Sequence, residues 1–357
     1  MAKATKNPLD LLNLSGLAKL EKKPQASGTR GAKSTAFAAK APTPNLGALS
    51  ELPGTWTGTG FNLIELPNMN QAKPGPPPTD KFKVILNNTA ETLVFSDIDG
   101  EIINRGNAQS DIAYLGLHYL QSVSDVNLPK GENGIHLETG LFLNLPSGTD
   151  PNVQPSIARL GSIPHGDSLL AQGTFFTVPG GPQFGTPPVP PFPPVLPPIL
   201  PIADPTPFTI VNGKRVNDTS ETYLSLLKNA IPPKGIPKDA IMDPNSILRN
   251  AIVGQNIIET TVIFLDANPI EGVCNPNAIK NAGGITNIPF INVNANANSL
   301  TAIFWIEKIL NKDNSITWQL QYTQTVILDF PVFGAPPKSD VTPIKWPHIS
   351  VATLIRS

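Results

Sequence analysis

Cysteine, charge and long apolar runs are all scarce in this sequence. The single cysteine, Cys274, excludes an internal disulfide and a cysteine-cluster metal site, although it could pair between chains. Charged residues make up 15% of the chain and the net charge is -1, so there is no basic footprint for nucleic acid and no polybasic membrane patch. No apolar run reaches 18 residues, and the N-terminus lacks the hydrophobic core of a signal peptide. We therefore expect a soluble, cytoplasmic protein without a membrane span.

Proline and glycine, by contrast, are abundant, with 40 and 28 residues. Proline has no N–H for a strand ladder, so these residues are expected in loops and insertions around a compact β body. We divide the chain into residues 1–50, a short amphipathic helix on a flexible tether, and residues 51–357, a β-barrel domain. Insertions are expected at about 178–256, which is proline-rich and then helical, and at 269–298, an asparagine-rich loop that holds Cys274.

The strands are predicted from alternating apolar and polar residues between turn residues. Two short helices are expected at 219–228 and 245–256. The predicted strands are 81–86, 91–95, 101–104, 112–123, 135–145, one that leads into a tight turn within 156–167, 257–266, 300–310, 316–329 and the last residues of the chain.

The final strand, Trp346 to Ser357, carries the first candidate ligand. At a strand period of two, one face has His348 followed by Ser350, Ala352 and Leu354. Two small residues after an imidazole leave room for a flat, bulky group held through the ring nitrogen, and a porphyrin iron suits such a face. The alternative is an ordinary polar residue at a strand start.

The strand from Gly134 to Phe142 places His136 and Glu138 on one face. Such a pair can share a proton or a substrate, or it can be a satisfied polar patch. A following tight turn, Pro164 to Gly166, presents His165. His118 lies on another strand, and its face, inward or outward, is undecided.

Several segments resemble one family in the same order. The stretch Gly54-Thr55-Trp56-Thr57-Gly58-Thr59-Gly60 resembles the opening motif of the nitrobindins and of the nitrobindin-like domain of THAP-type proteins. Residues 135–142 resemble that family's His-Glu-(Thr/Ser)-Gly strand, and residues 156–174 resemble its next strand–turn–strand. The last strand resembles the family's C-terminal strand with its proximal haem histidine, and His348 falls at that place.

This resemblance implies an antiparallel ten-stranded barrel, similar in shape to fatty-acid-binding proteins, that holds haem b with His348 on the iron. Trp56, Gly58, Thr59 and Gly60 are then expected near the cofactor, since alternate glycines let a backbone pass close to a neighbour or a ligand. His165, His136 and Glu138 are the expected catalytic residues on the open side, where an imidazole moves a proton for peroxidase, peroxygenase or peroxynitrite isomerase chemistry. Asp167 is an alternative orienting group. Family members are about half as long as this chain.

Two other readings remain. A haem-free barrel could bind a small apolar ligand such as a lipid or terpenoid, with the proline-rich segment as its lid. A structural or assembly protein could dock, or form a homo-oligomer, through the N-terminal helix. The sequence has no Gly-x-Ser-x-Gly elbow for a serine hydrolase, and its four scattered histidines disfavour a structural zinc site.

Overall fold

A computed structural model of the chain describes part of the sequence in detail. The described residues are 45–68, 82–106, 110–146, 155–184, 208–211, 214–217, 227, 229–267, 283–290, 294–330 and 344–357. The expected N-terminal helix, Cys274 and most of the proline-rich segment lie outside these ranges.

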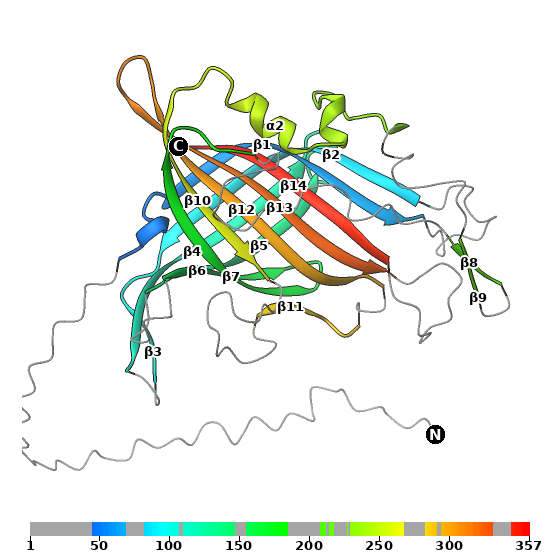
Figure 1. The fold of residues 1–357 in the computed structure, drawn as a ribbon, viewed down its shortest axis with the longest axis horizontal. Helices are drawn as coiled ribbons and strands as arrows, with labels where there is room; N and C mark the ends of the chain where they lie inside the picture. Colours follow the sequence, from blue (N-terminus) through cyan, green and yellow to red (C-terminus); the bar gives the residue numbers. More distant parts are fainter. Residues whose placement is uncertain are drawn as a thin grey trace, which may run out of the picture. The chain divides into compact units, whose positions relative to one another are not determined.

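Ten antiparallel strands close into a barrel (Figure 1). Neighbouring strands pair in the order β10-β12-β13-β14-β1-β2-β4-β5-β6-β7, and β7 pairs again with β10. The predicted ten-stranded antiparallel barrel is therefore confirmed. Its strands are β1 (Gly54–Pro67), β2 (Phe82–Asp97), β4 (Ile112–Asp125), β5 (Gly134–Leu145), β6 (Ser156–Ile163), β7 (Asp167–Pro179), β10 (Ile257–Asp266), β12 (Asn296–Leu310), β13 (Ile316–Phe330) and β14 (Ile344–Arg356).

Shorter elements attach to this barrel or lie outside its strand order. β3 (Ile102–Asn104) pairs with β4, β11 (Gly284–Asn287) pairs with β7, and β8 (Phe208–Val211) pairs with β9 (Lys214–Asn217) in a separate two-stranded sheet. The helical elements are η3 (Gly47–Leu49), η4 (Lys238–Ile241) and α2 (Asn245–Ala251). The predicted helix at 245–256 is thus present in shorter form.

Aromatic side chains fill the middle of the barrel. Ring centroids lie 5.2 Å apart for Tyr119 and Phe142, 5.6 Å for Phe142 and Phe304, and 5.6 Å for Phe304 and Tyr322. Leu320 of β13 and Ala352 of β14 join the same buried cluster. The described interior is a packed core at this level, because side chains from opposite walls touch.

The outer wall is apolar where η4 and α2 lie across it (Figure 1). Ile349 and Val351 of β14 pack there with Leu248 of α2. Polar contacts add to the packing, because Gln321 donates to the Leu248 carbonyl at 3.1 Å. The alternate residues of β14 therefore face the barrel interior, as the strand pattern predicts.

The two ends of the barrel differ. At one end, which we call the plugged end, η3 enters the barrel and the buried Leu49 and Leu52 join the core. We call the segment from Gly47 to Leu52 the plug. The indole nitrogen of Trp56 donates to the Leu52 carbonyl at 2.7 Å and fixes this plug. The compact unit begins at Pro44, so the last residues assigned to the tether belong to the barrel. The β4–β5 turn, the β6–β7 turn and the start of β14 all lie at the other end, which we call the mouth.

Gly58 and Gly60 serve the contact between β1 and β14. A Cβ atom on Gly58 would lie 2.0 Å from the Thr353 carbonyl oxygen, and one on Gly60 would lie 2.2 Å from that of Val351. No side chain fits at these distances. The Gly-Thr-Gly stretch therefore allows two strands to approach closely.

The predicted strands 81–86 and 91–95 form the single strand β2. Its intervening polar residues resemble a turn in sequence, but Asn87 faces inward and donates to Asp125 at 2.7 Å. Glu91 accepts hydrogen bonds from Tyr322 and Gln121 inside the barrel. The polar residues have partners, so the strand continues through them.

Among the described residues, no helix is both long and apolar enough to cross a membrane.

Candidate functional site

Three of the four histidines gather at the mouth. His348 lies near the start of β14, His136 near the start of β5, and His165 in the β6–β7 turn. The rings of His136 and His165 are 5.5 Å apart, and both imidazoles act electrostatically on His348. The fold thus brings together three residues that the sequence spreads over more than 200 positions.

His348 occupies the inner face of the wall. Ala352 and Leu354, on the same face of β14, belong to the interior core, whereas Ile349 and Val351 pack under α2. Burial, and then the neighbouring His136 and His165, lower the pKa of His348 to about 4. The ring is therefore neutral at pH 7 and keeps a nitrogen lone pair.

The ring nitrogen Nε2 of His348 has little competition for that lone pair. It lies 3.5 Å from Oγ of Ser350, at the outer limit of a hydrogen bond. No other hydrogen bond to this ring is found within the described part of the chain. Because the neighbouring inward positions of β14 hold Ser350 and Ala352, the wall beside the imidazole has small side chains.

Glu138, just inside the mouth, anchors a buried ionic network. Its carboxylate accepts a hydrogen bond from Arg159 at 2.7 Å and another from the Tyr119 hydroxyl. Glu138 is 0% and Arg159 2% exposed, so water does not screen their attraction. Burial raises the pKa of Glu138, but Arg159 and hydrogen bonds from His136 and Tyr119 outweigh it and lower that pKa to about 2. This carboxylate is consequently ionised across the ordinary pH range.

The other oxygen of Glu138 faces His136, with 3.4 Å between Oε2 and Nε2. Arg159 also donates to Gln324 of β13 at 2.7 Å, which ties opposite walls together. Gly161 makes room for this arrangement, since a Cβ atom there would lie 2.6 Å from Oε1 of Glu138. His136 therefore has a fixed negative partner on one side.

His165 stands at the rim and is exposed. Burial of part of the ring, then the charge of His136, lowers its pKa, against the opposite effect of Asp167. Burial raises the pKa of Asp167 itself. A neutral imidazole here can accept a proton from a molecule at the mouth and return it.

A second polar group lies deeper. Tyr322 donates to Glu91 at 2.6 Å, and Gln121 donates to the same carboxylate at 2.8 Å. Burial raises the pKa of Glu91 to about 6 despite these hydrogen bonds. The group is enclosed in the core, so its contacts stabilise the interior.

The other predicted site residues lie elsewhere. Trp56 pairs with Arg356, eight residues from His348 along β14, which is roughly 26 Å at the strand rise of about 3.3 Å. Thr59 is exposed on the outside, and Gly58 and Gly60 contact the β14 backbone. We therefore assign these four residues to strand packing and to the plug.

His118 faces outward on β4, where it contacts Oγ1 of Thr139 at 2.8 Å. The sequence left open whether His118 faces inward or outward, and the structure places it on the solvent side. The three histidines of the mouth are therefore His136, His165 and His348.

Comparison with protein families, with curated proteins and with solved structures finds no match. Within the described ranges, no three His, Cys, Asp or Glu side chains are grouped so that they could share a metal ion.

Sequence reasoning missed Arg159, Tyr119 and Gln324. A signal for Arg159 does exist, because it lies between Ile157 and Gly161 on the inward face of β6. A charged residue on an apolar strand face requires a buried partner. Only the folded barrel identifies that partner as Glu138 of the neighbouring strand.

Proposed function

We propose that the mouth binds haem b, with Nε2 of His348 as the iron ligand, and that the bound protein reacts with peroxides or reactive nitrogen oxides. The observation that carries this proposal is the state of His348. It is an inward-facing, neutral imidazole with a nearly unused ring nitrogen, set opposite two further imidazoles.

The residues present fit such a group. A neutral histidine is a common protein ligand of haem iron, and small residues follow it on the same wall. Ile64 of β1 and Ile85 of β2 are cross-strand partners that face inward at the mouth. Their apolar side chains suit a flat apolar macrocycle. Haem iron, when bound, supplies the centre at which a peroxide or a nitrogen oxide is activated.

The chain supplies proton transfer on the opposite side. His165 accepts the proton of a hydroperoxide and returns it to the leaving oxygen, because its lowered pKa keeps the ring neutral and the ring reaches solvent. Glu138 orients His136 beside it, and Arg159 keeps Glu138 from taking up that proton. These contacts support the roles proposed for His165, His136 and Glu138.

A haem-free carrier of an apolar ligand is the alternative. The packed aromatic middle weighs against it, since a lipid chain in a barrel of this kind would need the space that Phe142, Phe304 and Tyr322 occupy. An apolar ligand would have to remain at the mouth.

The test is a hemin titration followed by absorption spectroscopy. We expect a stoichiometric Soret band for the wild type that is lost or strongly shifted in His348→Ala and is partly restored by free imidazole. His118→Ala is the matched control, because it removes an outward-facing histidine. Equal hemin spectra for all three proteins would refute ligation by His348.

The proton-transfer roles need a separate measurement. In His165→Ala and His136→Ala we expect an unchanged Soret band and a rate with hydroperoxide or peroxynitrite that falls by about 10²–10⁴-fold. If no protein binds hemin specifically, binding of a fluorescent fatty acid at the mouth tests the alternative function.

A further inference from the structure

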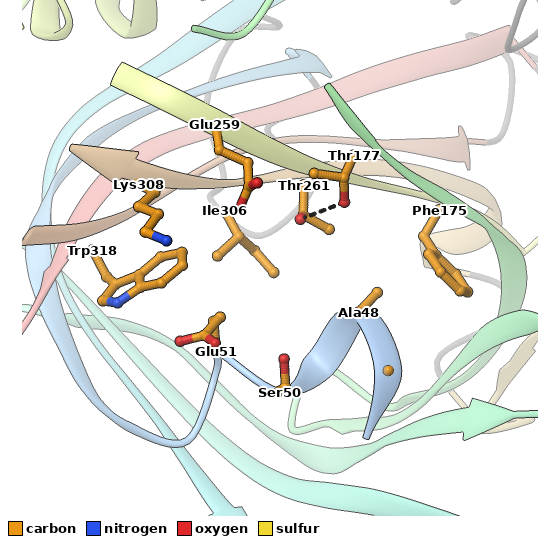
Figure 2. Close-up of a pocket in the computed structure, with 11 residues that line it drawn as sticks. Ala48, Ser50, Glu51, Phe175, Thr177, Glu259, Thr261, Ile306, Lys308 and Trp318 are labelled. Atoms are coloured by element: carbon orange, nitrogen blue, oxygen red, sulfur yellow. Dashed lines mark hydrogen bonds between the residues drawn. The ribbon is translucent and has the colours of Figure 1, made fainter. Parts of the chain in front are cut away.

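The plugged end contains a separate pocket, with a volume of about 360 Å³ (Figure 2). The plug forms one side of it, and β7, β10, β12 and β13 form the others. A volume of this size is at the lower end of small-molecule sites. The pocket shares no residue with the histidine mouth.

Two opposite charges face this pocket without an ion-pair partner. Glu259 of β10 and Lys308 of β12 are direct cross-strand neighbours. Neither forms an ion pair within the part of the chain that the structure describes. Lys308 instead places its ammonium 5.7 Å from the centre of the Trp318 ring. Figure 2 shows both side chains directed into the hollow.

The third charge in the pocket is already balanced. Glu51 of the plug lies 3.7 Å from the guanidinium of Arg356, which also donates to the Glu51 carbonyl at 2.8 Å. Lys308 and Glu259 therefore remain as one positive and one negative group available to a ligand.

The pocket is less polar towards β7. Phe175 and Ile306 project into it, and the hydroxyls of Thr177 and Thr261 are 2.9 Å apart and bonded to each other (Figure 2). The two hydroxyls bond to each other, so the apolar contact in this part of the pocket comes from Phe175 and Ile306. The pocket thus combines a bipolar side with an apolar one.

A simpler view is that Lys308 and Glu259 form a solvated cross-strand pair. Opposite charges at such positions stabilise a sheet when they meet. Here the ammonium lies over Trp318, and no salt bridge joins it to the Glu259 carboxylate among the described residues. A ligand that carries both charges can connect the two groups.

We propose that this pocket binds a small zwitterion with an apolar side chain, such as an apolar α-amino acid. Its carboxylate contacts Lys308, its ammonium contacts Glu259, and its side chain lies against Phe175 and Ile306. The proposal is independent of haem binding at the mouth.

Calorimetric titration with three matched compounds tests it. L-phenylalanine carries both charges, phenethylamine lacks the carboxylate, and hydrocinnamic acid lacks the ammonium. We expect L-phenylalanine to bind the full-length protein at least tenfold more tightly than either analogue. Lys308→Met should reduce the affinity for L-phenylalanine tenfold or more and leave the affinity for phenethylamine unchanged. Glu259→Gln should also reduce the affinity for L-phenylalanine tenfold or more, but leave the affinity for hydrocinnamic acid unchanged.

Asp111→Asn is the matched control, because it removes an exposed carboxylate that pairs with Arg105 and does not line the pocket. Circular dichroism verifies that each variant is folded. No binding of L-phenylalanine at millimolar concentration, or equal binding by the wild type and both pocket variants, would overturn the proposal.

Discussion

The mouth and the plugged end of the barrel handle charge in opposite ways. At the mouth, Glu138 and Arg159 are buried and joined, and the imidazoles stand around this fixed pair. At the plugged end, Lys308 and Glu259 are neighbours in register but remain apart at an accessible pocket. A buried charge needs a permanent partner from the fold, whereas an accessible one can take its partner from solution.

The largest expected effect breaks the buried pair. Arg159→Met leaves Glu138 in the core without its cation, so we expect the free energy of unfolding to fall by about 3–5 kcal/mol. Urea denaturation measures it. Lys308→Met at the plugged end is the comparison and should stay within about 0.5 kcal/mol of the wild type. Similar losses in both variants would remove the distinction between the two ends.

A second variant weakens the plug itself. Leu49 is fully buried, so Leu49→Ala should cost about 2–5 kcal/mol through lost contacts and a cavity. Thermal or urea unfolding measures that loss. The hemin spectrum should not change, because the mouth lies at the far end of β14. A changed Soret band in Leu49→Ala would mean that the two ends are coupled.

The third expected effect concerns the stability of the protein in acid. The folded-state pKa of His348, about 4, lies below its ordinary value of 6.5, so the unfolded chain takes up a proton first as the pH falls. The contribution of neutral His348 to the free energy of unfolding is complete above pH 6.5 and is lost as the pH falls from 6.5 to 4. In haem-free protein, His348→Gln should flatten the dependence of unfolding free energy on pH in this window, and Lys308→Met should not.

The sequence predicted what depends on the alternation of residues within one strand. Strand β10 has the bounds expected for it, and β14 turns His348 inward with Ala352. It did not predict contacts between strands that are distant in the chain, such as Arg159 with Gln324. The alternation of apolar and polar residues predicts which face of a strand a side chain occupies, but not which residue contacts it from another strand. The plug was missed because Leu49 lies in a short turn with no periodic pattern.

The pairing of β1 with β14 also has a consequence for how the protein folds. Trp56 and Arg356, 300 positions apart, face each other across this pair, and His348 reaches the mouth only when it forms. Contacts so distant in sequence form slowly, because the entropy of closing a long loop is lost before the contacts contribute any stabilising energy. A partly folded chain has all three histidines but not their cluster. We therefore expect the mouth to be completed late in folding, and a ligand that needs the cluster to recognise only the closed barrel.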